Sequence, residues 1–530
     1  MRHRRWLLLP LLPLLVLAGA WTRAPRPPEQ KPALLVLLSV DQLRADLLER
    51  YAPYFTGGFH RLLQEGVVYT GVHMHAGTET APGHATLGTG VYPSHSGIVA
   101  NNWYVWKGGE WVRVYNVQDT TERIVGLPGQ MGMSPRHLMH TGTADWVLAA
   151  NPAAKVVSIS GKDRSAILMA GKSRGDVYWF DRGVGRFITS TYYAAAYPSW
   201  VESFNSQVLP TLWDSVWVES SPVAARKLAR PDTASYEGDA VHTFFPHSYA
   251  VEGKGRKFSA WVGGTPQVDR AVLELVEAAI PATGLGRDSI TDYLDVGLSQ
   301  TDYVGHGYGP LSREQLDNLM KLDKELADFF AYLDRTVGKG RWVAVLSGDH
   351  GSTTMPEWQA AHGKPGQRVT AEMREPAEKA AAEAFRNARV GKGPQAAAEA
   401  YRSFPFVADA YTLTEVSRGT PRDSFVMLYR HSYYPGRVRS AAGELGVDVR
   451  LQEGDYPSHG STGTGHGSPY IYDRIVPMIF LGGGLEPVRH AGLVPTVDLA
   501  PTLARLGGIP VPDDLDGKAL PLNPNQGGSE

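Results

Sequence analysis

The chain has 530 residues, with 52 Lys and Arg against 54 Asp and Glu, 43% hydrophobic residues and no cysteine. The near-neutral charge excludes the basic footprint of a protein that binds nucleic-acid polymers, and the hydrophobic share excludes a disordered chain. Without cysteine there can be no disulfide, thiolate nucleophile, cysteine-ligated zinc or cysteine-derived formylglycine. A catalytic metal would therefore have to be held by histidine and carboxylate side chains.

The first 20 residues have the pattern of an export signal. Basic residues precede an apolar run from Trp6 to Ala20, and the run ends in the small residues that a signal peptidase requires. It is shorter than the roughly 20 residues of a spanning helix and contains two prolines. We expect a cleaved signal peptide over residues 1–20, a linker over 21–32 and a periplasmic or secreted protein. An uncleaved membrane anchor is the alternative.

Five apolar segments rich in β-branched residues are predicted to be strands buried on both faces. They cover residues 33–40, 155–160, 289–300, 341–348 and 474–483. Ionisable residues follow four of these segments and precede the fifth. Ligands of open α/β sheets bind at the carboxyl ends of the strands. The pattern therefore predicts an α/β fold with a mostly parallel sheet, one edge of which gathers the ionisable groups.

Helical periodicity fills the gaps between the strands. Ser312, with Gln315 three residues on, is typical of a helix start, and regularly spaced leucines continue until Gly338. This helix would join segment 289–300 to segment 341–348 as a βαβ crossover. Further helices are expected over 268–279, 370–402 and 497–506, and a strand over 424–430. We expect insertions near 103–150, 177–265 and 365–455, and a flexible tail over 521–530.

Three carboxylates and three imidazoles next to the predicted strands are candidate metal ligands. They are Asp41, Asp349 and His350 at strand ends, Asp302 and His306 in a predicted loop, and His466 before the last strand. Six such ligands divide into two three-ligand sites with open positions, which is the layout of catalytic zinc. Two ions about 4 Å apart can clamp the attacking and leaving oxygens of a phosphoryl displacement. Each residue alone is more often a cap or loop support, so the interpretation depends on the whole set.

Seven motifs occur along the chain in the order VDQLRAD, ETAPGHAT, HSGIVANNWY, SGKDR, QTDYVGHGYG, SGDHG and GHGSPYIYDRIVPMIFLG. In these motifs the sequence resembles the alkaline phosphatase superfamily, and closely its branch of threonine-nucleophile periplasmic phosphatases related to type I phosphodiesterases and nucleotide pyrophosphatases. The resemblance covers most of the mature chain. It implies one alkaline-phosphatase-like catalytic domain over residues 33–520, built as a three-layer sandwich with large insertions.

The resemblance also implies a role for each matching residue. Thr80 would be the nucleophile, phosphorylated and dephosphorylated in each cycle. Asn101 would donate to one phosphate oxygen, and Lys162 and Arg164 would bind the others. One zinc would be held by Asp41, Asp349 and His350, and the other by Asp302, His306 and His466. The implied enzyme is an alkaline phosphatase with two Zn²⁺ per chain that acts on a broad range of small phosphate monoesters. We expect a monomer without stable membrane insertion.

Physical chemistry supports these roles but leaves alternatives open. A threonine hydroxyl is a poor nucleophile until a metal or base activates it. A monoester dianion carries one more charged oxygen than a diester, so the Lys162 and Arg164 pair favours monoesters. A phosphodiesterase or nucleotide pyrophosphatase with the same metals, and a non-catalytic metal- or phosphate-binding relative, are the alternatives. His84 and His95 are interpreted as hydrogen-bonding loop supports, and His140 is assigned no role.

Overall fold

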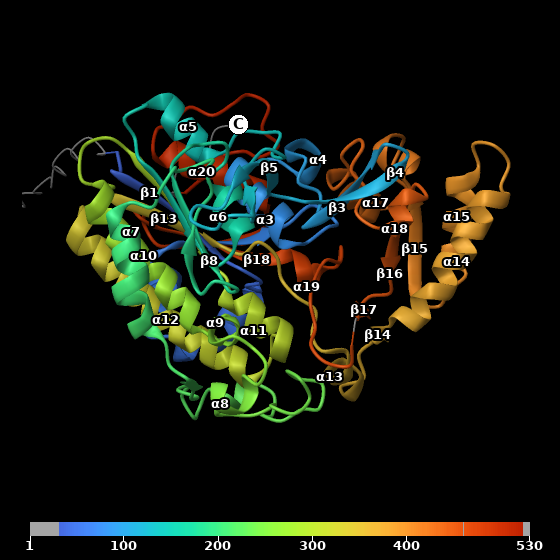
Figure 1. The fold of residues 1–530 in the computed structure, drawn as a ribbon, viewed down its shortest axis with the longest axis horizontal. Coiled ribbons are helices and arrows are strands. Elements are labelled where there is room, and N and C mark those ends of the chain that lie inside the picture. Colours follow the sequence, from blue (N-terminus) through green and yellow to red (C-terminus); the bar gives the residue numbers. More distant parts are fainter. Residues whose placement is uncertain (1–30, 459, 523–530) are drawn as a thin grey trace, which may run out of the picture. The chain divides into compact units, whose positions relative to one another are not determined.

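A nine-stranded, mostly parallel sheet runs through the centre of the protein (Figure 1). The computed structural model describes residues 31–458 and 460–522, so the predicted signal peptide, most of the linker and most of the tail lie outside the described residues. In spatial order the strands are β19 (Val488–Pro495), β2 (Val67–Val72), β18 (Ile475–Gly482), β13 (Trp342–Ser347), β1 (Leu34–Val40), β12 (Asp292–Leu298), β7 (Val156–Ser160), β8 (Asp176–Asp181) and β9 (Arg186–Ile188).

The central strand β1 shows why helices must cover both faces of the sheet. All seven of its residues are buried, and successive side chains of a strand point to opposite faces. Leu34 and Val36 therefore belong to one hydrophobic cluster, whereas Leu35 and Leu37 belong to another. Each cluster requires its own layer of helices, and the predicted three-layer α/β fold is confirmed.

The helices divide between the two faces of the sheet (Figure 1). One face packs against α1 (Ala45–Tyr51), α2 (Gly58–Glu65), α10 (Gln267–Thr283) and α12 (Arg313–Leu333). The other packs against α3 (Thr80–Thr89), α5 (Thr143–Ala150), α6 (Asp163–Met169) and α20 (Leu499–Leu506). The crossover helix predicted from the leucine spacing is α12, which links β12 to β13. Ser312 Oγ accepts a hydrogen bond from the backbone N–H of Gln315 at 3.0 Å and caps its first turn.

The direction of β18 determines where the loop before it lies. β1 is parallel to β12 and β13, and β12 is parallel to β7, so the carboxyl ends of these four strands share one edge of the sheet. β18 is antiparallel to β13. Its first residue therefore lies at the edge where the other strands end, and the loop that carries His466 reaches the same edge. The sheet thus gathers all five predicted strand-end segments in one place.

Residues 424–430 form a helix, so the strand predicted there is wrong. Asp423 caps α17 (Ser424–His431) by accepting from the backbone N–H of Val426 at 2.9 Å. Val426, Leu428 and Tyr429 then bury one helical face. The β-branched and aromatic residues that suggested a strand are compatible with either structure in so short a run. The start of segment 177–265, expected to be an insertion, instead contributes β8 and β9 to the central sheet.

Segments outside the sheet surround the edge where the strands end. Residues 102–133 form β3 (Asn102–Lys107), β4 (Glu110–Tyr115), β5 (Gln118–Arg123) and β6 (Met131–Met133). Residues 199–262 contain α7 (Ser199–Ser203), β10 (Val216–Trp217), β11 (His247–Ser248), α8 (Tyr249–Glu252) and α9 (Phe258–Val262). The segment after β13 contains α13 (Pro356–Ala361), α14 (Ala371–Asn387), α15 (Gly393–Arg402), β15 (Val407–Thr412) and β16 (Val447–Leu451), and the last four share a small core. Within residues 31–458 and 460–522, we find no helix with the length and apolarity needed to cross a bilayer.

Candidate active site

Thr80 is the first residue of α3 and lies at the strand-end edge with 1% of its surface exposed. Its Oγ1 accepts a hydrogen bond from Arg164 Nη2 at 3.4 Å. The next backbone N–H, that of Ala81, donates to Asn101 Oδ1 at 2.8 Å, which holds Asn101 beside the helix start. The positive end of a helix dipole favours an anion at this position. The nucleophile predicted from sequence and its predicted amide donor therefore meet at an anion-favouring helix terminus.

Lys162 connects the carboxylates of the two predicted metal groups. It precedes α6, and its buried Nζ lies 2.8 Å from Asp41 Oδ2 and 2.5 Å from Asp302 Oδ2. Burial by itself would lower the pKa of the Lys162 amine, but Asp302 and Asp41 outweigh that effect and raise the pKa above its usual value. Lys162 is therefore a fixed positive charge between two aspartates.

The N–H groups of Arg164, which lies beside Thr80, have weak protein partners or none. Its Nη1 donates to the hydroxyl of Tyr115 at 3.4 Å, and that hydroxyl donates to Asp163 Oδ1 at 2.7 Å. The Nε of Arg164 is buried without a hydrogen-bond partner among the described residues. Burial opposes the charge, but the neighbouring Tyr115 and Asp163 raise the pKa of Arg164 above its usual value. An anion with several oxygens would satisfy these donors.

Asp302, His306 and His466 form a compact ligand group. Asp302 and His306, expected in a loop, lie one turn apart in α11 (Gln300–Tyr308), where residues i and i+4 share a face. His306 Nε2 is 3.2 Å from Asp302 Oδ1, and His466 Nε2 is 3.5 Å from the same oxygen. The helix and the loop before β18 therefore supply the three ligands together.

The rings of His306 and His466 have the orientation that is usual for metal-binding histidines. The Nδ1 of His306 lies 2.8 Å from the carbonyl oxygen of Thr464, and the Nδ1 of His466 lies 2.7 Å from that of Thr78. A carbonyl oxygen only accepts, so each Nδ1 must carry the proton. Burial lowers the pKa of His466, so its Nε2 presents a lone pair toward Asp302; burial also acts on His306, but Asp302 outweighs it and raises the pKa of that ring. A backbone acceptor behind the ring is the usual way in which proteins orient a metal-binding histidine.

The second predicted group contains one more histidine than expected. His350 Nε2 lies 3.2 Å from Asp349 Oδ2, and its Nδ1 donates to the Gly351 carbonyl at 2.9 Å. His84, interpreted from sequence as a support, also lies here, and Asp41, His84 and Asp349 form a compact ligand group. His84 Nε2 is 3.2 Å from Asp41 Oδ1. The compact group therefore contains His84 where the sequence predicts His350, whose Nε2 contacts Asp349.

The charge states expected for the two imidazoles distinguish them. Burial lowers the pKa of His350 well below its usual value, so this ring is neutral and its Nε2 can bind a metal. For His84 burial acts in the same direction, but Asp41 and Asp349 outweigh it and raise the pKa. His84 also donates from Nδ1 to the Thr80 carbonyl at 2.8 Å. These contacts favour His350 as the ligand and His84 as a charged support for the nucleophile.

Several buried polar atoms of the second group have no hydrogen-bond partner among the described residues. They are both carboxylate oxygens of Asp41, Oδ2 of Asp349 and Nε2 of His350. Lys162 and His84 balance the charge of Asp41 in ion pairs. The neutral His350 ring, however, donates nothing to Asp349 Oδ2, and a divalent cation between these two acceptors would lower the cost of burying them. The rings of His350 and His466 stack with centroids 3.5 Å apart, so the two ligand groups adjoin each other. The residues therefore fit two neighbouring metal ions.

Gln42, Glu79 and Tyr303 contact the site but are not among the residues predicted from the motifs. Gln42 has a positive φ of 62°, donates from its backbone N–H to Asp349 Oδ1 and from Nε2 to Asp302 Oδ1, both at 2.9 Å, and so braces both groups. Glu79 Oε2 accepts from the backbone N–H of the predicted amide donor. The Tyr303 ring centroid lies 4.8 Å from the Nζ of the site lysine. All three residues lie in the quoted motifs, and this position was the one feature of the sequence that could have indicated them.

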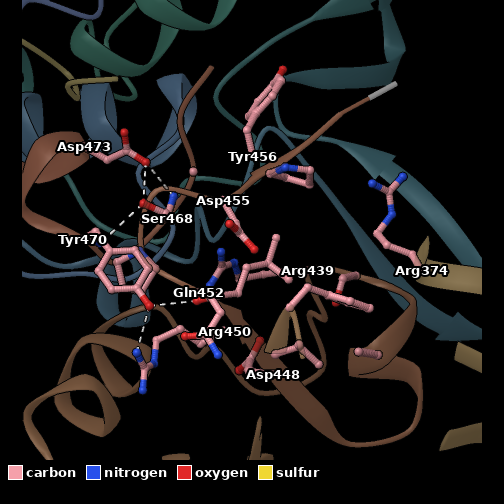
Figure 2. Close-up of a pocket in the computed structure, with 18 of the residues that line it drawn as sticks. Arg374, Arg439, Asp448, Arg450, Gln452, Asp455, Tyr456, Ser468, Tyr470 and Asp473 are labelled. Atoms are coloured by element: carbon pink, nitrogen blue, oxygen red, sulfur yellow. Dashed lines mark hydrogen bonds between the residues drawn. The ribbon is translucent and has the colours of Figure 1, made fainter. Parts of the chain in front are cut away.

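A cavity of about 320 Å³ borders the loop that carries His466 (Figure 2). Its lining includes Ser468, Tyr470 and Asp473 of that loop, and Ser468 Oγ donates to Asp473 Oδ2 at 2.6 Å. On the facing segment, Arg450 Nη1 donates to the Tyr470 hydroxyl at 2.9 Å. The predicted ligand His466 lines this cavity, whereas the predicted nucleophile and phosphate-binding residues do not. It therefore adjoins the metal-ligand loop but does not include the reaction centre.

A separate buried ionic cluster surrounds His247. Its Nδ1 lies 2.8 Å from Glu252 Oε1 and its Nε2 lies 3.2 Å from Glu314 Oε1. Burial alone would lower the pKa of His247, but the two glutamates outweigh it and raise the pKa to about 9. The histidine is therefore a buried cation that holds the segment around β11 against α12.

Comparisons with known proteins agree with this geometry. The family model for type I phosphodiesterase / nucleotide pyrophosphatase matches residues 35–453. The alkaline phosphatase PafA of Elizabethkingia meningoseptica is 33% identical over 539 residues, covering 96% of this chain and 98% of the relative. The alkaline phosphatase PhoV of Synechococcus elongatus is 33% identical over 517 residues, covering 92% of both chains.

A crystal structure of wild-type PafA superposes with a TM-score of 0.85 at 30% identity, covering 92% of this chain and 98% of that one. A match of this extent confirms the resemblance inferred from the seven motifs. The chain belongs to the type I phosphodiesterase / nucleotide pyrophosphatase family, within the alkaline phosphatase superfamily.

Proposed function

We propose that this protein is an exported, zinc-dependent alkaline phosphatase that hydrolyses a broad range of phosphate monoesters through a phosphothreonine at Thr80. The observation that carries the proposal is the contact between the Thr80 hydroxyl and Arg164, beside two adjoining groups of aspartate and histidine ligands. The relatives named alkaline phosphatase over most of their length support it. The proposed export rests on residues 1–20, and a monomer remains our expectation.

Two groups of residues would hold the metals. Asp302, His306 and His466 would bind one zinc, and Asp41, Asp349 and His350 the other. Histidine and carboxylate ligands in groups of three suit catalytic zinc, which keeps open positions for substrate. When bound, the two ions would lower the pKa of the threonine hydroxyl and stabilise charge on the entering and leaving oxygens.

The chain's own residues would bind and orient the phosphoryl group. Arg164 would donate to one non-bridging oxygen through its weakly engaged N–H groups, and Asn101 would donate from its amide nitrogen to another. Lys162 would supply a fixed positive charge close by. Such donors contribute most where charge spreads over the equatorial oxygens of the transition state.

The reaction would proceed in two displacements. Thr80 Oγ1 forms a bond to phosphorus as the bond to the alcohol oxygen breaks, and the alcohol leaves with a proton. Water then attacks the phosphothreonine and releases inorganic phosphate, which restores the threonine hydroxyl. Buried surroundings keep bulk water away from Thr80 before the ester binds.

A phosphodiesterase or nucleotide pyrophosphatase is the second candidate, because the matching family model is named for these activities. The two candidates share metals and nucleophile and differ in how many charged oxygens the site must accept. A half-buried Arg164 with a buried, unpartnered Nε favours the more highly charged monoester. The monoesterase is therefore the preferred proposal.

Hydrolysis of an aryl phosphate monoester by the purified, zinc-loaded chain tests this proposal. We expect release of inorganic phosphate, loss of that activity in Thr80→Ala, and partial retention in Thr80→Ser, which keeps a hydroxyl. An acid quench during turnover, followed by peptide mass spectrometry, should find phosphate on Thr80. The proposal fails if the wild type releases no phosphate, or if Thr80→Ala is as active as the wild type.

A further inference from the structure

A third group of candidate ligands lies outside the active site and joins three distant parts of the chain. His95 is in α4 (Pro93–Ser96), His140 precedes α5, and Asp514 follows α20. His140 Nε2 is 3.3 Å from Asp514 Oδ1, and His95 Nε2 is 3.7 Å from Asp514 Oδ2. One ligand atom from each residue falls within a common 4.8 Å. The sequence analysis interpreted His95 as a loop support and assigned no role to the others.

The Nδ1 atoms of both histidines face acceptors, which leaves both Nε2 atoms pointing at Asp514. His140 Nδ1 donates to the carbonyl oxygen of Thr141 at 2.8 Å. His95 Nδ1 lies 3.6 Å from Asp516 Oδ2, which also accepts the Tyr92 backbone N–H at 2.8 Å. A carboxylate or carbonyl behind each ring is the arrangement that orients metal-binding histidines. His140 matches His306 and His466, whose Nδ1 atoms also lie within 2.8 Å of a carbonyl oxygen, whereas the Nδ1 of His95 is farther from its acceptor.

Asp514 faces the Nε2 atoms of both imidazoles, and either a proton on Nε2 or a metal ion between the three residues can balance its carboxylate. Protonating both rings would place two cations side by side, because the ring centroids are only 4.8 Å apart. A single divalent ion satisfies all three acceptors at once. Tetrahedral ligands with metal bonds of about 2.0–2.1 Å are separated by roughly 3.4 Å, close to the two observed distances. Imidazole ligands select zinc-like transition ions over calcium or magnesium.

We propose that His95, His140 and Asp514 bind one divalent transition metal ion of the zinc class, separate from the two metals proposed for the active site. The ion fastens the C-terminal segment, residues 507–522, to the turn after the nucleophile helix. The structure describes no helix or strand in that segment. Among its hydrogen bonds is that from the backbone N–H of Gly517 to the Gly90 carbonyl, at the end of α3. Lys518 and Leu520 also donate backbone hydrogen bonds to Asp498 and Thr502, and Leu520 packs in the core, so a metal would add to these contacts at the Asp514 end of the segment.

Metal analysis of the purified, zinc-dialysed chain tests the proposal without reference to activity. His140→Ala and Asp514→Asn should each contain about one ion per chain fewer than the wild type. Asp514→Asn guards against misfolding, because its side chain is 67% exposed and hardly changes shape. His242→Ala is the matched control, since His242 pairs with Asp239 at 2.8 Å outside all three ligand groups found in the described residues. Equal metal content in all four proteins would overturn the proposal.

Two further measurements locate the ion and its effect. Anomalous diffraction at the zinc edge from wild-type crystals should show a peak between the three ligand atoms, and no peak there overturns the proposal. Hydrogen exchange over residues 507–522 should be faster in Asp514→Asn than in wild type and unchanged in His242→Ala. If exchange in that segment is the same in Asp514→Asn and in wild type, the ion does not fasten it.

Discussion

Replacing Arg164 by alanine tests whether this guanidinium recognises the extra charge of a monoester. Its two contacts to neighbouring hydroxyls are both 3.4 Å long, and its Nε has no partner among the described residues. Hydrogen bonds of that length are weak, so the variant should lose little folding stability. The variant should instead bind the phosphate group of the substrate more weakly.

The expected decrease in kcat/KM follows from the hydrogen bond to phosphate that the substitution removes. One hydrogen bond to a charged group contributes about 1.5–3 kcal/mol, so Arg164→Ala should lower kcat/KM for an aryl monoester roughly ten- to hundredfold. A diester has one charged oxygen fewer and should lose much less. Arg164→Lys, which keeps the charge but not the planar fork, should lie between wild type and Arg164→Ala.

The assay measures kcat/KM for an aryl monoester and an aryl diester in parallel, at a fixed zinc concentration. Urea unfolding of both variants controls for stability, and their midpoints should match that of the wild type. Equal losses on the two substrates would show that Arg164 does not select between them. An unchanged monoester rate would refute its contact with substrate.

Three more outcomes follow from the geometry. His350→Ala should lose about one zinc per chain, while His84→Gln should keep it; the reverse result would make His84 the ligand. Tyr115→Phe should lower monoester kcat/KM by roughly two- to tenfold through looser positioning of Arg164, and an unchanged rate would contradict that role. The folded pKa of His247, about 9, exceeds its unfolded value of 6.5, so its stabilisation is complete below pH 6.5 and is lost as pH rises toward 9. Urea unfolding should show a loss of about 3 kcal/mol across that window in wild type, and a flatter profile in His247→Gln.

Most of the sheet could be predicted because its strands are buried on both faces. Continuous apolar runs such as residues 34–40 exclude most other structures, and the leucine spacing of α12 has a period that only a helix satisfies. Residues 424–430 were predicted to be a strand because seven residues are too few to distinguish the periodicity of a strand from that of a helix. There the cap by Asp423 decided the outcome.

The motifs identified candidate metal ligands, but they did not show which side chains contact those ligands. Asp302 and His306 were expected in a loop, although their spacing of four residues also fits the helical turn that sets their 3.2 Å approach. Gln42 could not be recognised, because its role depends on two aspartates that lie hundreds of residues away. The interpretation of His84 as a support, in contrast, agrees with its contacts to Asp41 and to the Thr80 carbonyl.

The sequence by itself determined the fold class, the family and the set of residue types available for chemistry, because these depend on local apolar patterns and on short motifs. The tertiary structure decided which of those residues meet. The antiparallel direction of β18 brings the His466 loop to the strand-end edge, and long-range packing brings Asp514 to His95 and His140. Contacts of that kind depend on how distant segments pack, and no local pattern encodes them.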